Sequence, residues 1–501
     1  MAGALGAWLA VGLLPGAAAA VGPGGAERGA AGRTGVERAV GKRGGGERVG
    51  AAGRVGGGRE AGRFAAGRTE RVGLAHDGAQ LNRDAHGYAL RADGRSLIFT
   101  TEADHVVPGD TDGRADTFVR DLDSGHVERL DLIGSQWEVV ELSASADGRF
   151  LAFAARRTEA PPDELPEEDL FLHDRHTHRT EPLLPTSPDP GKGLQMVEIS
   201  ANGRTVVFQS VRPDLVPGDT NGVADIFAYD RWQGSVRRAN VYSDGTQAPR
   251  AATQPVVSGD GRRVGFISRT PVGDPRPGPA RGPAAPSATP QASGSAKPPE
   301  SVEPPGPSGS RKPRFEPLYV HDLDTGRTVA ASTTSDGTDV GATRGSLSAD
   351  GRFALFASRS HLVVPGDANG VHDLFLRDLE RGTTERVSLT PGGGEANGES
   401  VYGVLSPDGR TLLFTSDASN LVPGDTNEVA DLFARDLRTG AVERLTIRAD
   451  GTQSSTAPEE YAGAVLTDAE ARQVVFVSAD DHLVPGDTNA VSDLFARHRG
   501  D

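Results

Sequence analysis

The sequence contains no cysteine among its 501 residues. This absence excludes disulfide bonds, thiolate metal sites, cysteine nucleophiles and a lipid anchor on an N-terminal cysteine. Basic residues are also in deficit, because 53 Lys and Arg face 69 Asp and Glu, which leaves a formal net charge of −16. An acidic body repels the phosphates of nucleic acids. We therefore expect no nucleic acid partner, and the charge favours solubility and cation binding.

Long apolar runs are absent after residue 20, which excludes an integral membrane domain further along the chain. Residues 1–20 form an apolar run that ends in an Ala-rich stretch and resembles a secretory signal peptide, although no Lys or Arg precedes Arg28. The sequence therefore predicts a secreted or extracytoplasmic protein, with the cell envelope as a further possible location.

Two segments lack apolar periodicity. Residues 21–66 are built from Gly, Ala, Arg and Glu, and residues 270–314 hold 13 of the 34 prolines. Both compositions indicate disorder. We interpret the first segment as a linker and the second as an insert that interrupts a repeat array.

The rest of the chain repeats itself. Seven similar segments such as "GRFALF" and "GRTLLF" end at Phe99, Phe153, Phe208, Phe266, Phe356, Phe414 and Phe476. The spacing between successive copies is nearly constant, except for the longer step from Phe266 to Phe356, which contains the Pro-rich insert. Seven copies at one period indicate a repeat architecture.

Each copy has the pattern of four short strands. A turn of the form S-A-D-G-R, as at Ser348 to Arg352, precedes a β-branched and aromatic strand, and two further strands of the types "DLFARDL" and "VERLTI" follow. A strand ahead of the S-A-D-G-R turn completes the set. The 66 glycines and 34 prolines suit many short strands joined by turns. Four antiparallel strands per repeat predict an all-β, seven-bladed β-propeller over residues 67–501, with the insert in its fourth blade.

The ring is predicted to close through its two ends. The last copy stops after its third strand at "DLFARHRGD", and residues 67–80, "GRTERVGLAHDGAQ", match the fourth strands of other copies. We expect this N-terminal strand to complete the last blade, which removes the open sheet edges that invite aggregation.

The repeats resemble the WD40-like (PD40) repeats of TolB-type β-propellers. The shared pattern is S-x-D-G-R-x-x-x-F, then D-L-F-x-x-D-L-x-T-G, then E-R-L-T, and it covers about residues 67–501 without the insert. The resemblance implies the propeller fold. Related propellers precede serine peptidase domains, but this sequence contains no G-x-S-x-G motif.

Five copies carry an acidic loop of the type "LVPGDTNGVADIF". Three oxygen-bearing side chains in one tight loop are candidate Ca²⁺ ligands. The candidates are Asp110, Asp112, Asp116, Asp219, Asn221, Asp225, Asp367, Asn369, Asp373, Asp425, Asn427, Asp431, Asp487, Asn489 and Asp493. The alternative is that these side chains only brace the turn by accepting backbone N–H bonds. The spacing departs from that of an EF-hand loop, which favours this alternative.

No catalytic set emerges from the sequence. His173, His176 and His178 cluster in one hairpin, where a solvated turn is favoured over a zinc site. The acidic loops share a face with loops such as "SDGTQ". The sequence therefore predicts a non-enzymatic, monomeric scaffold that binds a protein or glycan through this Asp-rich face, with calcium as a possible stabilising ion.

The alternative function is an enzyme, a hydrolase or lyase, with its site in the central channel. The first strands should line this channel, and several glutamates lie in or beside them. They are Glu138, Glu141, Glu198, Glu399, Glu459 and Glu460.

Overall fold

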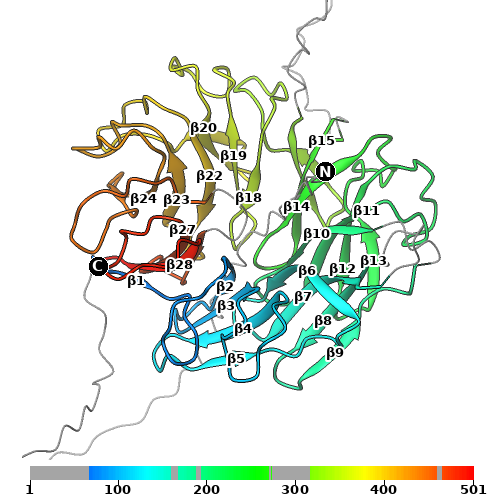
Figure 1. The fold of residues 1–501 in the computed structure, drawn as a ribbon. Coiled ribbons are helices and arrows are strands. Elements are labelled where there is room, and N and C mark those ends of the chain that lie inside the picture. Colours follow the sequence, from blue (N-terminus) through cyan, green and yellow to red (C-terminus); the bar gives the residue numbers. More distant parts are fainter. Residues whose placement is uncertain are drawn as a thin grey trace, which may run out of the picture. The chain divides into compact units, whose positions relative to one another are not determined.

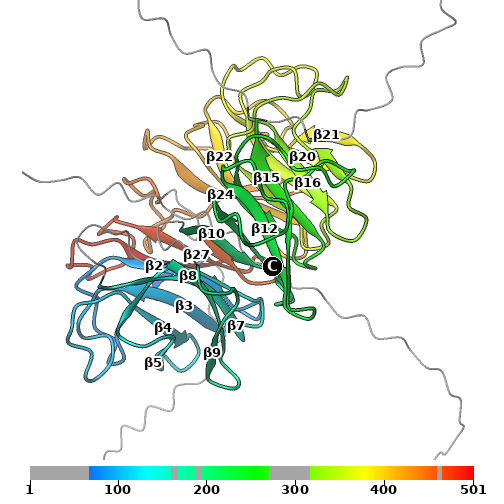
Figure 2. The same ribbon diagram turned by 90° about the vertical axis from the view of Figure 1, so that its right-hand side faces the viewer.

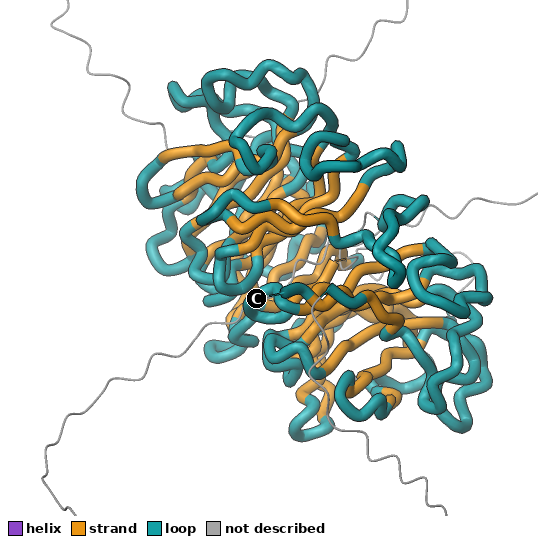
Figure 3. Tube along the Cα trace, turned by 90° about the vertical axis from the view of Figure 1, so that its left-hand side faces the viewer, coloured by secondary structure: helices purple, strands orange, loops and turns teal. Residues whose placement is uncertain are grey.

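The computed structural model describes residues 67–159, 168–187, 193–269, 272–273, 316–459 and 465–500. The predicted signal (1–20) and linker (21–66) lie outside these ranges, as does the predicted insert (270–314) apart from Val272 and Gly273. The described chain is all strand and loop, and no helix in it is long and apolar enough to cross a membrane (Figure 3).

The strands form seven four-stranded antiparallel sheets, which confirms the predicted seven-bladed β-propeller (Figure 1). Blade 1 consists of β2 (Ala85–Leu90), β3 (Ser96–Thr101), β4 (Asp116–Asp121) and β5 (Val127–Arg129). Blade 2 consists of β6 (Trp137–Ala144), β7 (Phe150–Arg157), β8 (Glu168–Asp174) and β9 (Arg179–Pro182). Blade 3 consists of β10 (Leu194–Ile199), β11 (Thr205–Ser210), β12 (Asp225–Asp230) and β13 (Ser235–Arg238).

The remaining blades follow the same order. Blade 4 consists of β14 (Ala252–Val257), β15 (Arg263–Ser268), β16 (Leu318–Asp322) and β17 (Thr328–Ala330). Blade 5 consists of β18 (Gly345–Leu347), β19 (Phe353–Ser358), β20 (Asp373–Asp378) and β21 (Thr383–Arg386). Blade 6 consists of β22 (Ser400–Leu405), β23 (Thr411–Ser416), β24 (Asp431–Asp436) and β25 (Val442–Arg444). Blade 7 consists of β26 (Val465–Thr467), β27 (Gln473–Ser478), β28 (Asp493–His498) and β1 (Thr69–Arg71).

The hydrophobic core is divided among the blade interfaces. Each of seven clusters in the described chain is shared by two neighbouring blades. The repeated Phe residues occupy these clusters, and within a blade they stack in pairs, with the Phe99 and Phe118 rings 5.6 Å apart. Because both faces of an inner sheet are covered, the strands are apolar at most positions rather than alternating.

The S-x-D-G-R turn joins the first and second strands of a blade. In blade 2 the Ser145 hydroxyl donates to Asp147 (2.6 Å), and Asp147 accepts the backbone N–H of Arg149 (3.0 Å). Gly148 adopts a φ of +65°, a conformation that a glycine takes without steric cost. The Arg149 side chain then pairs with Asp174 at the end of the third strand (2.8 Å). Figure 2 shows the loops gathered at the ends of the strands.

Ring closure uses both ends of the described chain. Strand β1 pairs antiparallel with β28, with Thr69 opposite Arg497 and Arg71 opposite Phe495. The buried Arg71 guanidinium lies between Asp487 (2.5 Å) and Asp493 (3.1 Å) on the last blade. The predicted closure is therefore confirmed. The ion pairs of Arg71 add to the backbone hydrogen bonds between β1 and β28.

Replacing Arg71 with Met should destabilise the ring by about 3 kcal/mol, because two buried carboxylates would lose their counterion. Urea unfolding measures this change. Arg68→Met is the matched control, since the Arg68 side chain is 55% exposed and its ion pair with Glu70 lies at the surface. Equal stability of the two variants would show that the ion pair contributes nothing to closure.

Candidate functional site

The five acidic loops join the second and third strands of blades 1, 3, 5, 6 and 7. The final aspartate of each loop is the first residue of the third strand, as Asp225 is in β12. The Asp-rich loops share a face with the "DGTQ"-type segments, as predicted, because Gln247 donates to Asp219 (2.9 Å) and accepts the backbone N–H of Thr220 (3.3 Å).

An arginine from the fourth strand lies against the aspartates in every one of these blades. It stands directly opposite the repeated Phe of the third strand, as Arg238 stands opposite Phe227. The guanidinium of Arg238 contacts Asp219 (3.1 Å) and Asp225 (3.0 Å). Equivalent pairs are Arg386 with Asp367 (3.4 Å) and Asp373 (3.3 Å), and Arg444 with Asp425 (3.4 Å) and Asp431 (3.1 Å). Arg71 plays this part in blade 7.

The arginine and the acidic loop occur together. Blades 2 and 4 lack the loop, and the register position of the arginine is taken there by Pro182 and Ala330. In blades 3, 5, 6 and 7 the guanidinium is therefore the counterion of the buried aspartates. Burial raises the pKa of Asp225 and Asp431, and that of Asp493 to about 6, while the arginine opposes the shift.

The segment that leads to the next blade covers the acidic loop in these four blades. The central Asn donates to its own aspartate and to a backbone carbonyl of the connector, the segment that leads to the next blade. The acceptors in the connectors are the carbonyls of Ala248 (2.9 Å), Ala396 (3.1 Å), Ser454 (3.0 Å) and Leu81 (2.9 Å). The amide hydrogens of these asparagines are thus used inside the protein.

Blade 1 departs from this arrangement in three ways. Asp112 stands where the other loops have Asn, so it cannot donate to Asp116 or to a connector. The connector from β5 to β6 covers only positions 130–136 and is about half as long as the connectors at 72–84, 239–251 and 387–399. Arg129 lies 3.7 Å from Asp110 and 3.2 Å from Asp116, and its side chain is 40% exposed, against 6–10% for its four counterparts.

The carboxylates of the blade 1 loop are consequently under-compensated. Asp110 is 2% exposed, and neither of its carboxylate oxygens has a partner with good hydrogen-bond geometry. Burial raises the pKa of Asp110, and it raises that of Asp116 to about 6. Carboxylate oxygens of Asp110, Asp112 and Asp116 all lie within 4.8 Å of one another.

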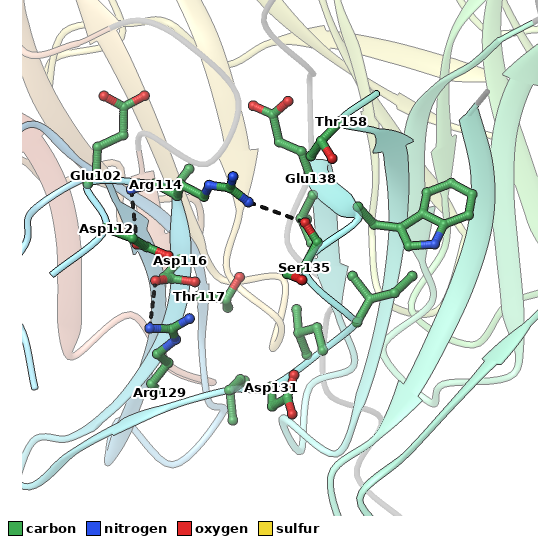
Figure 4. Close-up of a pocket in the computed structure, with 17 residues that line it drawn as sticks. Glu102, Asp112, Arg114, Asp116, Thr117, Arg129, Asp131, Ser135, Glu138 and Thr158 are labelled. Carbon is green, nitrogen blue, oxygen red and sulfur yellow. Dashed lines mark hydrogen bonds and ion pairs between the residues drawn. The ribbon is translucent and has the colours of Figure 1, made fainter. Parts of the chain in front are cut away.

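A cavity of about 740 Å³ opens beside this loop, between blades 1 and 2. Figure 4 shows Glu102, Asp112 and Asp116 on one side and Glu138 and Thr158 on the other. Arg114 crosses part of the opening and donates to the backbone carbonyl of Ser135 (3.2 Å). We call this cavity the blade 1–2 cleft. It adjoins the short connector, at the position where the longer connectors of other blades cover their acidic loops.

A second acidic group in the described chain lies in blade 7. Asp480, Asp481 and His482 place ligand atoms within 4.8 Å of one another. The buried Asp480, however, accepts hydrogen bonds from Ser454 (2.6 Å) and from Arg448 (3.3 Å). The described chain thus holds two acidic groups that could bind a metal ion, and only the blade 1 group leaves its buried carboxylate without well-formed hydrogen bonds.

The glutamates predicted near the channel divide into two kinds. Glu141 and Glu198 are turned toward the next blade, where they accept the backbone N–H of Val197 (2.9 Å) and of Val257 (3.3 Å). The others pair near the surface: Glu138 with Arg156 (2.8 Å), Glu399 with His372 (3.4 Å) and Glu459 with Ser492 (3.2 Å). Glu460 lies outside the described residues.

The predicted solvated histidine hairpin needs a correction. Strand β8 extends to Asp174, so His173 belongs to the strand and is buried, with Nδ1 2.9 Å from the Thr180 hydroxyl. His176 and His178 lie exposed in the turn.

Sequence reasoning treated the five loops as equal and missed the arginine partners. Two signals were present: Asp112 in place of Asn, and the short connector after Arg129. Both become meaningful only when the loops are compared position by position, because the arginine lies on the strand after the aspartate in sequence and beside it in space, as Arg444 lies beside Asp431.

Comparisons with known proteins support the fold. No protein-family model and no curated protein sequence matches the chain. Among solved structures, an oligogalacturonate lyase in complex with manganese superposes with a TM-score of 0.50 at 13% identity, covering 87% of this chain and 94% of that one. An oligogalacturonate lyase from Vibrio parahaemolyticus gives 0.49 at 12% identity (87% and 97% coverage), and a putative TolB from Agrobacterium tumefaciens gives 0.34 at 13% (75% and 94%). The superposition with the first of these shows a shared propeller fold, which is the fold that the TolB-type repeats predicted.

The pH dependence of stability should report the burial of Glu141. Burial raises its pKa from the ordinary 4.5 to about 7 in the folded protein. A raised folded-state pKa means that the contribution to stability is complete below pH 4.5 and is lost as the pH rises through 7. The free energy of unfolding of the native protein should therefore fall more steeply between pH 5 and pH 8 than that of Glu141→Gln.

Urea unfolding at four pH values tests this expectation. Glu181→Gln, an exchange at an exposed position of β9, is the control and should keep the native slope. If Glu141→Gln also kept the native slope, Glu141 would not be the group responsible.

Proposed function

We propose that this protein is a glycan-binding propeller whose recognition site is the blade 1–2 cleft. The observation that carries the proposal is the cleft itself, an open polar hollow on the acidic-loop face where the other described loops are covered by their connectors. Its volume of about 740 Å³ falls in the range of sites for small ligands. A protein partner would need a larger, flatter surface with an apolar centre.

The lining of the cleft suits a ligand rich in hydroxyl groups. Exposed carboxylates of Glu102, Asp131 and Glu138 are hydrogen-bond acceptors, and the guanidinium groups of Arg114 and Arg129 are donors. Sugar hydroxyls both donate and accept, so a short oligosaccharide can satisfy both sets. The protein-binding reading of the Asp-rich face remains the alternative, and it predicts a partner that covers several blades.

Calcium is the cation that we propose for this face, because carboxylate oxygens are the ligands that a hard divalent cation prefers. We also propose that the protein is exported and monomeric, as the apolar run at 1–20 and the closed ring suggest. Fractionation of expressing cells and light scattering of the purified protein test these two points.

A glycan array followed by titration calorimetry tests the binding function. Glu138→Ala and Arg114→Ala should each lower the affinity for the glycan at least about tenfold, the effect of losing one charge-assisted hydrogen bond. Glu428→Gln, in the covered acidic loop of blade 6, is a matched control at an exposed position and should bind normally. Binding that is unaffected by both cleft variants would place the site elsewhere.

The second candidate function is an enzyme that acts on acidic glycans from the central channel. Glu141, with its pKa raised to about 7 on a first strand, is the group suited to general acid–base chemistry. The shared fold with an oligogalacturonate lyase in complex with manganese makes oligogalacturonate with Mn²⁺ the first substrate to try. Turnover that Glu141→Gln abolishes would favour this function, and binding without turnover would favour the first.

A further inference from the structure

We infer that the blade 1 loop holds one divalent cation, Ca²⁺ by preference, between Asp110, Asp112 and Asp116, and that the acidic loops of blades 3, 5, 6 and 7 hold none. This deepens the proposed function, since the cation would border the same cleft, but its test needs no glycan. The sequence alone offered all five loops alike as candidate Ca²⁺ sites and favoured the alternative that they only brace the turn.

The four covered loops already contain their cation. In blades 3, 6 and 7 two aspartates meet one guanidinium, and the asparagine between them donates its amide hydrogens internally. In blade 5 the guanidinium of Arg386 bonds Glu395 as well (2.7 Å). A metal ion at these positions would have to displace a buried arginine, whose side chain is 6–10% exposed.

The blade 1 loop lacks the asparagine, and its arginine is 40% exposed. At the three aligned positions blade 1 has three carboxylates, where blades 3, 6 and 7 have two carboxylates and an asparagine. One fourth-strand arginine faces the set in each blade, and the Arg114 side chain of the blade 1 loop is directed to the carbonyl of Ser135. No amide hydrogen separates Asp112 from Asp116, because a carboxylate at position 112 only accepts hydrogen bonds.

Asp110 supplies an observation independent of the charge count. Its side chain is 1% exposed and its two oxygens have no partner with good hydrogen-bond geometry, although a buried carboxylate normally accepts several hydrogen bonds. Its nearest described counterion, Arg129, approaches only to 3.7 Å. The carboxylate lies beside those of Asp112 and Asp116, with ligand atoms of all three within 4.8 Å of one another. A buried acceptor without a well-formed hydrogen bond, within a group of three carboxylates, is the arrangement that a hard cation satisfies.

The ion would keep coordination positions open toward the cleft. Ca²⁺ takes six to eight oxygens, and three carboxylates leave room for water or for ligand oxygens. Asp112 and Asp116 both line the cleft, so a bound glycan and the ion would be neighbours.

Calorimetric titration of the apo protein with CaCl₂, up to about 10 mM, tests the inference. We expect one site per chain with a dissociation constant of roughly 10⁻⁴–10⁻³ M, the range of extracellular calcium modules, and a rise in melting temperature. Asp112→Asn, which recreates the loop of the other blades at an exposed position, should weaken binding at least about tenfold without lowering the melting temperature of the apo protein. The exposed position makes misfolding an implausible cause.

Asp481→Asn is the matched control, because it removes an exposed aspartate from the second acidic group and should leave calcium binding unchanged. A stoichiometry near five, a loss of binding in Asp481→Asn alone, or no heat and no thermal shift at the highest Ca²⁺ concentration would each overturn the inference. Glycan binding can fail while calcium still binds, and the reverse, so the two proposals are separable.

Discussion

The structure depends on hydrophobic cores that are each shared by two neighbouring blades. Each of the seven clusters takes its residues from two neighbouring sheets, so a blade without its neighbour would leave one or both faces in water. The ring has as many interfaces as blades, one more than an open row of the same blades. The short strand β1 closes the ring, because it pairs with β28 of blade 7 and leads through its connector into blade 1.

The candidate site lies where blade 1 departs from the pattern of the other repeats. The pairing of an acidic loop with a fourth-strand arginine is present in five blades and lost as a unit in blades 2 and 4. This makes the acidic loop, in most of its copies, a structural element held by an internal ion pair. In blade 1 the same parts are present but the asparagine and the long connector are missing. The exposed cleft and the under-compensated carboxylates arise together from these two changes.

Much of the fold could be predicted from the sequence because its signals are local and repeated. The Phe99-type strands, the D-G-R turns and the displaced fourth-strand copy at residues 67–80 each constrain their immediate neighbours. The candidate site was harder, since its chemistry depends on residues brought together across strands. The Arg238–Asp219 contact follows from strand register and from a loop that folds back, neither of which a single copy reveals. His173 was misplaced for a related reason: β8 continues beyond the point where the turn was expected and carries the ring inward.

In blade 4 a long stretch of sequence separates two strands that pair directly. Strands β15 and β16 pair in full register from Arg263–Asp322 to Ile267–Leu318, although the whole Pro-rich segment separates them in sequence. The two halves of the molecule on either side of this interval meet twice, once through that ladder and once through β1 and β28. A single cut between residues 273 and 316 would thus yield two fragments that hold each other at both seams, which makes this propeller a natural candidate for splitting into complementing halves.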